Sequence, residues 1–427
     1  MTEVDTKPKR RFGGSKRSTD AEKTGTDNDT SGDGVRVARR RPRTFGKVLN
    51  QIPDDILLDK ELNEAIKLLP SNYNFEIHKT VWNVRKNKSR RVCLQMPEGL
   101  LIYSLVITDI LEQFCGCEVL VMGDVSYGAC CIDDYTARAL DCDFIVHYAH
   151  SCLVPVDITL IKVLYVFVTI GIDETHLVNT IRRNFDHGVR LALFGTIQFN
   201  PAIHSVKARL ENPDLSSAKE NDHKLIYATP PQTMPLSKGE VLGCTSARLE
   251  AEQYDAMVYV GDGRFHLESA MIHNPDIPAF RYDPYSRKFT RELYDQKELV
   301  QVREDAINAA SNAKTIGLIL GSLGRQGSPV TLEALEAKLV ASGKTVVKII
   351  LSEIFPGKLA MFDKIDAFVQ VACPRLSIDW GYAFNKPLLT PYETMVMLGQ
   401  DRKWTKDYYP MDYYSRDGYG RGKLPTH

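Results

Sequence analysis

The sequence predicts an α/β protein made of three related Rossmann-like units with parallel sheets in a triangular arrangement, behind a disordered basic N-terminal tail. From residue 90 onward, short β-branched or aliphatic runs alternate with amphipathic stretches, which is typical of parallel strands joined by crossover helices. The pattern occurs three times. A chain of 427 residues also exceeds what one hydrophobic core organises, so domains of roughly 100 to 150 residues are expected.

The first two elements precede the sheets. Residues 1–45 combine Lys/Arg runs with Ser, Thr, Gly and Asp and carry almost no large apolar side chains, so burial cannot offset their ordering entropy. Their run RRRPR at 39–43 admits a targeting or RNA-contacting role, although a solvated basic tail is the simpler interpretation. Residues 46–89 are predicted as a helical lead-in because their leucines and isoleucine keep near-helical spacing.

Three α/β segments follow, at residues 90–188, 189–312 and 313–410, with a C-terminal tail at 411–427. Each segment is predicted to open with a strand and its loop, at 91–99, 190–196 and 314–321. Each also carries a later strand led in by an aspartate, at 143–148, 255–260 and 366–371. This recurrence indicates duplication of one ancestral unit.

Composition indicates an intracellular, cytoplasmic protein. No stretch approaches the roughly 18 to 20 apolar residues of a membrane span, and no secretory leader opens the chain. Lys plus Arg and Asp plus Glu both number 54, so net charge gives no case for nucleic-acid binding. In a reducing compartment the nine cysteines are expected to be thiols, metal ligands or catalytic groups.

Three cysteines fall on loops at the carboxyl ends of predicted strands, where ligands bind open parallel sheets. They are Cys130, Cys244 and Cys373, each more than 100 residues from the next. Structural zinc sites usually take closely spaced ligand pairs, so this spacing disfavours zinc. It is compatible with a soft multi-iron site assembled from separate loops, but from spacing alone free core cysteines are the default.

The other cysteines are interpreted mostly as packing residues. Cys131 adjoins Cys130, and the sequence does not say which sulfur points inward. Cys152 lies in the loop that matches Cys373 and is the strongest competitor for a site role. Small buried hydrophobes are expected at Cys93, Cys115, Cys117 and Cys142.

Two glycine-bearing loops follow strands on the same predicted edge, at residues 261–268 and 321–327. Their glycines would let a ligand approach the backbone, and an arginine there can clamp a carboxylate with two hydrogen bonds. In both loops the alternative is a simple βα turn with a surface salt bridge. The candidate cofactor-binding residues are Gly261, Asp262, Gly263, His266, Gly324 and Arg325.

Five motifs resemble those of the eukaryotic diphthamide synthesis subunit 1 family, and in particular of its fungal members. They are QMPEGLL (95–101), GDVSYGACCIDD (123–134), HYAHSCL (147–153), GDGRFHLES (261–269) and VACPRLSIDWGYAF (371–384). The likeness runs from about residue 50 to 420 and leaves out the basic tail.

The resemblance implies a transferase with a 4Fe-4S cluster held by one cysteine of each segment, at Cys130, Cys244 and Cys373. The reduced cluster would cleave S-adenosylmethionine to a 3-amino-3-carboxypropyl radical, which would add to a histidine of translation elongation factor 2 in the first step of diphthamide biosynthesis. Family members form a heterodimer with the related subunit 2, and a small iron-binding protein with its reductase supplies electrons. No membrane or nucleic-acid partner is implied.

Three alternatives stay open at this point. A dehydratase resembling quinolinate synthase would also use a three-cysteine cluster, with its open iron as a Lewis acid. A non-catalytic scaffold would only support a partner subunit. A structural zinc protein would be colourless.

Overall fold

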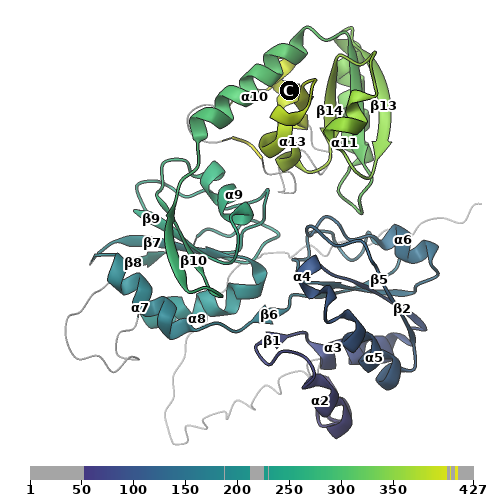
Figure 1. The fold of residues 1–427 in the computed structure, drawn as a ribbon, viewed down its shortest axis with the longest axis vertical. Helices are drawn as coiled ribbons and strands as arrows, with labels where there is room; N and C mark the ends of the chain where they lie inside the picture. Colours follow the sequence, from purple (N-terminus) through teal and green to yellow (C-terminus); the bar gives the residue numbers. More distant parts are fainter. Residues whose placement is uncertain are drawn as a thin grey trace, which may run out of the picture. The chain divides into compact units, whose positions relative to one another are not determined.

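The computed structural model describes residues 52–186, 188–211, 226–228, 230–401, 404 and 409–411. All described residues belong to one compact unit. The expected tail at 1–45 and all but the first residue of the one at 411–427 lie outside the described residues. Helices and strands alternate in the described part (Figure 1), which confirms the α/β class.

The expected lead-in is mainly helical. Asp59 begins its second helix as an N-cap, because its carboxylate accepts the N–H groups of Glu61 and Leu62 at 3.0 and 3.1 Å. Ile56, Leu62 and several later apolar residues pack into the core of the first sheet. The elements are α1 (Asp54–Leu57), α2 (Lys60–Ile66), β1 (Tyr73–Asn74) and α3 (Ile77–Asn87), and β1 pairs antiparallel with β6 (Thr169–Ile170).

The first sheet is parallel throughout and has the order β3-β2-β4-β5. Its strands are β2 (Arg91–Gln95), β3 (Glu118–Val121), β4 (Phe144–Tyr148) and β5 (Lys162–Val166). The helices between them are α4 (Glu98–Leu101), α5 (Ser104–Cys115) and α6 (Asp134–Ala139).

The second sheet, with the order β11-β10-β9-β7-β8, is mixed. Its outermost strand β11 runs antiparallel to β10, so the expected purely parallel sheet is wrong at this edge. The cause is a short turn, residues 284–287, that joins the two strands as a hairpin. The strands are β7 (Arg190–Gly195), β8 (Ile226–Ala228), β9 (Ala256–Val260), β10 (Ala279–Asp283) and β11 (Lys288–Glu292); the helices are α7 (Glu174–Asn184), η1 (Ile197–Phe199), α8 (Asn200–Glu211) and α9 (Phe265–His273).

The third sheet is parallel and has the order β13-β12-β14-β15. Its strands are β12 (Thr315–Gly321), β13 (Thr345–Leu351), β14 (Ala367–Val371) and β15 (Leu388–Leu389). Its helices are α10 (Gln296–Ser311), α11 (Pro329–Ala341), α12 (Pro356–Ala360), α13 (Pro374–Trp380), η3 (Gly381–Ala383) and α14 (Pro391–Met397). The three sheets fall inside the three predicted α/β segments, while their division into separate domains stays an interpretation.

The central strands are buried on both faces, as their continuous apolar runs predicted. In β7, for example, Leu191 and Leu193 belong to one hydrophobic core, while Ala192 and Phe194 belong to another on the opposite face. The alternation follows from the two-residue period of a strand.

The aspartate before the second central strand has the same role in all three segments. Its carboxylate accepts a backbone N–H at the start of the neighbouring opening strand, which fixes the register of the two. The pairs are Asp143 with Arg90 at 2.9 Å, Asp255 with Arg190 at 2.8 Å and Asp366 with Lys314 at 2.9 Å.

Candidate functional site

Cys130 lies in the loop between β3 and α6, at the carboxyl edge of the first sheet. The loop is shaped by the Cys131 N–H, which donates to the Gly128 carbonyl at 2.9 Å. Buried Gln95, the last residue of β2, donates from its side chain to the Cys131 carbonyl at 2.8 Å. The strand end therefore holds the cysteine loop directly.

Cys244 lies in a loop beside the end of β7. The N–H of Val241 donates to the Gly195 carbonyl at 3.0 Å, and the N–H of Gly195 donates to the Gly239 carbonyl at 2.9 Å. The Cys244 sulfur is 3.7 Å from the Thr245 hydroxyl oxygen. This cysteine is therefore also placed at the carboxyl edge of its sheet.

Cys373 follows β14 and is the N-cap residue of α13. Buried Gln370 donates to the Cys373 carbonyl at 2.9 Å, as Gln95 does in the first segment. Burial raises the pKa of the Cys373 thiol to about 12, and the neighbouring Cys130 adds to the shift, while the backbone N–H groups of Arg375 and Leu376 oppose it. Metal binding by this thiol must therefore release a proton.

The structure brings some of the predicted cysteines together. Cys130 helps to raise the pKa of Cys373, and Cys373 acts in the same direction on the pKa of Cys131, so these contributions do not choose between the two adjacent cysteines. Cys130 and Cys244 both pack against the hydrophobic core of the third sheet. Among the described residues, no group of three or more His, Cys, Asp or Glu side chains could hold a metal ion. The meeting of all three sulfurs around one group thus stays a prediction.

The surroundings fit the donor chemistry of an iron-sulfur cluster. The Gln326 side-chain amide donates to the Cys130 sulfur at 3.8 Å, and hydrogen bonds of this kind tune cluster thiolates. Gly324 has a φ of +54°, and a Cβ there would lie 2.6 Å from the Cys131 carbonyl carbon. Only glycine allows this loop of the third segment to approach the Cys130 loop so closely.

Arg325 joins the third segment to the first. Its guanidinium donates two hydrogen bonds to Asp134, at 2.8 and 2.6 Å, and its own N–H donates to the Cys130 carbonyl at 3.0 Å. Burial alone would raise the pKa of Asp134, but Arg325 and the Leu160 N–H keep it below its usual value. The expected carboxylate clamp is present with a carboxylate of the chain itself, so a cofactor role for Arg325 stays a prediction without support from this contact.

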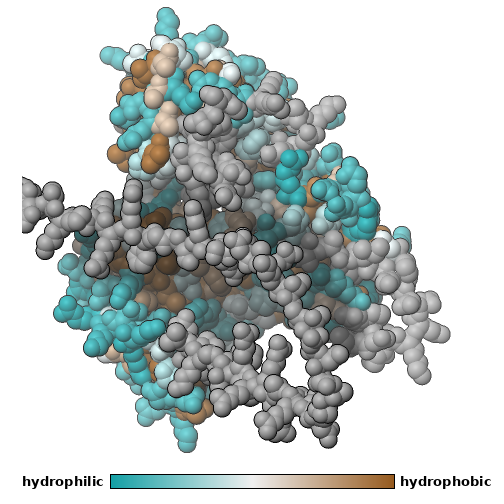
Figure 2. All heavy atoms as spheres, turned by 180° about the vertical axis from the view of Figure 1, so that it is seen from behind, coloured by the Kyte–Doolittle hydropathy of each residue, from teal (hydrophilic) through white to brown (hydrophobic). Residues whose placement is uncertain are grey.

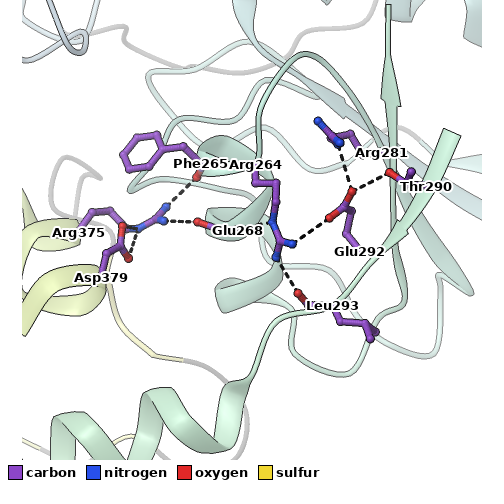
Figure 3. Close-up of polar contacts among 9 residues, drawn as sticks. All are labelled: Arg264, Phe265, Glu268, Arg281, Thr290, Glu292, Leu293, Arg375 and Asp379. Atoms are coloured by element: carbon purple, nitrogen blue, oxygen red, sulfur yellow. Dashed lines mark hydrogen bonds and ion pairs between the residues drawn. The ribbon is translucent and has the colours of Figure 1, made fainter. Parts of the chain in front are cut away.

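Arg375 joins the third segment to the second (Figure 3). It is 2% exposed. Its guanidinium donates to the Gly243 carbonyl, directly before Cys244, at 3.0 Å and to the Phe265 carbonyl at 2.7 Å. It also donates to Glu268 at 2.6 Å and to Asp379 of its own helix at 2.8 Å. One side chain two residues after Cys373 therefore fixes the loop that carries Cys244.

Glu240 joins the second segment to the first. Its buried carboxylate accepts a hydrogen bond from the Ser151 hydroxyl and another from the Ser237 N–H at 2.8 Å. Burial raises the pKa of Glu240 to about 7, and the Ser237 hydrogen bonds only partly oppose this. We call these three contacts, Arg325–Asp134, Arg375–Glu268 and Glu240–Ser151, the three joints.

A cavity of about 410 Å³ lies between the first and second segments and includes two of the predicted residues, Asp262 and His266. Val125, Ser126 and Tyr127, shortly before Cys130, form part of its wall. Burial lowers the pKa of His266 to about 4, with Arg375 adding to the shift. The described lining contains Glu98 and Asp262 but no Lys or Arg, so its charge favours a cationic ligand.

A second histidine in this cavity, His150, was not among the predicted site residues. Burial and the neighbouring His266 lower its pKa to about 4, so both imidazoles are neutral near pH 7. Gly261 and Gly263 lie in the loop that carries Asp262, and Gly263 has a φ of +61°. That backbone conformation explains a glycine at position 263 without a ligand, so a binding role for the two glycines stays a prediction.

Four other cysteines fit packing better than ligation, namely Cys93, Cys115, Cys117 and Cys142, which all belong to or pack against a hydrophobic core. Cys93 and Cys142 belong to one hydrophobic core, and burial raises the pKa of both. Cys131 is 2% exposed, whereas Cys130 is only partly buried. Cys152 is exposed; the partial burial of its sulfur raises its pKa to about 11, and the charges acting on it are Lys79 and Glu240.

Comparison with known proteins gives consistent results. The family described as "Putative diphthamide synthesis protein" matches residues 96–410. A 2-(3-amino-3-carboxypropyl)histidine synthase subunit 1 from Debaryomyces hansenii is 75% identical over 91% of this chain and 90% of its own length. The Saccharomyces cerevisiae protein of the same name is 66% identical over 100% of this chain and 98% of its own length.

Solved structures with a similar fold include Dph2 from Pyrococcus horikoshii, with a TM-score of 0.62 and 22% identity over 79% of this chain and 94% of that one. A second structure of that protein, with a 4Fe-4S cluster, has the same TM-score and identity over 78% and 94%. At this identity the likeness supports the fold. Within the described residues, no helix is long and apolar enough to cross a membrane.

Proposed function

The chain belongs to the diphthamide synthesis protein family, and we propose that it is the catalytic 4Fe-4S subunit of an enzyme that modifies translation elongation factor 2. The enzyme would transfer the 3-amino-3-carboxypropyl group of S-adenosylmethionine to a histidine of that factor. This is the first step of diphthamide biosynthesis. The observation that carries the proposal is that residues of the third segment hold both other cysteine loops: the Arg325 N–H donates to the Cys130 carbonyl, and Arg375, two residues after Cys373, donates to the Gly243 carbonyl directly before Cys244.

Cys130, Cys244 and Cys373 would hold the cluster. When bound, it would supply the electron that cleaves the sulfur–carbon bond of S-adenosylmethionine to release the 3-amino-3-carboxypropyl radical. The residues of this chain would position the cluster and S-adenosylmethionine and would exclude water from the site. Gln326 would donate to the Cys130 thiolate, and Arg325 and Arg375 would keep the three loops in place.

The cavity lined by Asp262 and His266 would bind S-adenosylmethionine. The sulfonium of this cofactor is cationic, which complements the carboxylates of Glu98 and Asp262. Aspartate or glutamate also suits ribose hydroxyls, as in dinucleotide sites. Because His150 and His266 are neutral, they would not repel the cation.

The proposed complex has further partners. The relatives are named as subunit 1, which implies another subunit, and we propose the related subunit 2. A small iron-binding protein and its reductase would supply electrons. We propose a cytoplasmic location for the enzyme, because translation elongation factor 2, its substrate, is found there.

The test is an anaerobic purification of the chain with subunit 2, followed by iron and sulfide analysis. Reduction of the purified complex in the presence of S-adenosylmethionine should release methylthioadenosine and attach the 3-amino-3-carboxypropyl group to elongation factor 2. Replacing Cys130, Cys244 or Cys373 by serine should each lower iron per complex and abolish both products, because serine is a poor iron ligand.

Cys131→Ser and Cys152→Ser are the matched controls, one beside the proposed ligand and one in the competing loop. Both should retain iron and product formation. Full activity in all three ligand variants would support a scaffold instead, and cluster loading without methylthioadenosine would support a dehydratase. Iron loss in Cys131→Ser but not in Cys130→Ser would show that Cys131, and not Cys130, is the ligand.

A further inference from the structure

The third sheet ends in a long apolar strand whose outer edge pairs with no strand among the described residues. Strand β13 pairs with β12 along all seven residues and is the first strand of its sheet. Val347 and Ile350 are 41% and 69% exposed, and in the segment after the strand Phe355 and Met361 are 46% and 79% exposed. Figure 2 shows hydrophobic residues gathered at this edge, at the upper left of the view.

The backbone of β13 has hydrogen-bonding groups on its free side. The Thr345 N–H donates to the Lys314 carbonyl at 2.8 Å, and the Leu351 carbonyl accepts the Ser322 N–H at 2.9 Å. The backbone N–H and C=O groups of the odd-numbered residues of β13 therefore face β12. Because direction alternates along a strand, the N–H and C=O groups of Val346, Lys348 and Ile350 face away from the sheet.

Other edge strands among the described residues are shorter or more charged. β3 has four residues and begins with Glu118, β15 has two residues, and β11 carries Lys288, Arg291 and Glu292. Native proteins usually protect edges with short strands and charges. β13 has only Lys348, which is paired with Glu336 on α11 at 3.0 Å. Its sequence TVVKIIL lacks the protection that a solvent-facing edge needs.

We propose that β13 is the docking edge for the partner subunit, which adds a strand of its own to the third sheet. The inference rests on the proposed function, because it takes the partner to be the related subunit 2 of that complex. A seven-residue strand offers an edge about 23 Å long, with main-chain hydrogen bonds for affinity and alternate side chains for specificity. Val347 and Ile350 would be covered in the complex, together with Phe355 and Met361.

A backbone test uses Lys348→Pro and Lys348→Thr. Both variants lose the ion pair with Glu336, but only proline loses the N–H that faces the free edge, and no bond to β12 is lost. Each is co-expressed with subunit 2, and the dissociation constant of the complex is measured with the purified chains. The proline variant should bind at least ten-fold more weakly than wild type, and the threonine variant within two-fold.

A side-chain test uses the double variant Val347→Lys/Ile350→Lys against Ile102→Lys/Leu105→Lys. The control residues are 77% and 70% exposed in the first segment. The β13 pair should abolish the complex while melting temperature and iron content of the isolated chain stay as in wild type. The control pair should assemble normally.

Unchanged affinity in both β13 variants would overturn the proposal, as would a wild-type chain that does not bind subunit 2. A wild-type homodimer that the lysines split would also overturn it, because the occupant would then be a second copy. If assembly depends on β13 but the complex holds no iron and releases no methylthioadenosine, the docking edge stands and the proposed function fails.

Discussion

At the scale of single residues, Arg375 connects more of the site than any cysteine does. Its partners Gly243, Phe265 and Glu268 lie more than 100 residues earlier in the chain. Figure 3 shows its guanidinium between Glu268 and Asp379, while Arg264 lies on the other side of α9 against Glu292. Both arginines form an ion pair with Glu268 of α9, but the Arg375 side chain is 2% exposed and the Arg264 side chain 47%.

We predict that Arg375→Ala lowers iron per complex well below half and destabilises the chain by about 3–5 kcal/mol, because it leaves buried acceptors unpaired. Arg375→Lys keeps the charge without the planar fork, so it should recover stability more than it recovers iron. Iron analysis, the visible spectrum and urea unfolding measure the two effects separately. Arg264→Ala is the matched control; its side chain is 47% exposed, and about 0–1 kcal/mol is expected. Full iron in Arg375→Ala would contradict the positioning role.

The sequence predicted residues whose signal is local and missed those whose partners are distant. Cys373 and His266 could be selected because they follow recognisable strands or loops. Asp134, Glu240 and Arg375 could not, since each acts through a residue from another segment. The motif CPR at 373–375 was the only available signal for Arg375, and it did not show where the side chain points or which residues it contacts.

At the scale of elements, the strands were predictable because their apolar runs and leading aspartates are local. The expected strands 190–196 and 366–371 correspond to β7 and β14 within one residue at each end. The antiparallel β11 was missed, because Lys288–Glu292 contains one apolar residue and two basic ones, and its pairing with β10 is set by a hairpin. A strand defined by its neighbour leaves little pattern of its own.

Helix α13, which begins after Cys373, depends on a buried ion pair behind it. Arg303 of α10 donates to Glu393 of α14 at 2.6 and 2.7 Å and to the Ser377 carbonyl of α13 at 2.7 Å. Both charged side chains are at most 1% exposed. Tyr409 also donates to Glu393, at 2.7 Å. One arginine therefore connects three helices that pack around the third sheet, although α10 lies within the predicted second segment.

We predict that Arg303→Met destabilises the chain by about 3–5 kcal/mol, because Glu393 stays charged and buried without its partner. The double variant Arg303→Met/Glu393→Gln should recover part of this loss, since the amide still caps α14 but has no charge. Urea unfolding of both variants measures the difference. A double variant as unstable as the single one would show that lost packing, and not the unpaired carboxylate, dominates.

At the scale of the whole described chain, each joint lies close to one proposed ligand. Asp134 and Glu240 are each four residues from a cysteine, and Arg375 is two residues from one. The contacts that join the segments therefore also set the geometry of the cysteine loops. The proposed ligands need no compact spacing in the sequence, because contacts between segments, and not the local chain, position their loops.

The joint at Glu240 makes stability depend on pH in a direction opposite to most carboxylates. Its folded pKa of about 7 lies above the ordinary value of 4.5, so the folded chain holds the proton more tightly than the unfolded chain. Stability from this group is complete below about pH 4.5 and is lost as pH rises through 7. The facing Cys152 thiol, with a pKa raised to about 11, stays neutral across this window.

Glu240→Gln should remove this dependence while an amide oxygen still accepts from Ser151. Relative to wild type, the variant should gain free energy of unfolding between pH 5 and pH 8, by at most on the order of 3 kcal/mol. Urea unfolding at four pH values measures the difference, with Glu333→Gln as control because Glu333 is an exposed carboxylate on α11. A constant offset between Glu240→Gln and wild type across that range would show that the carboxylate is already ionised at pH 5, and that the joint between the first and second segments is held by a charged acceptor.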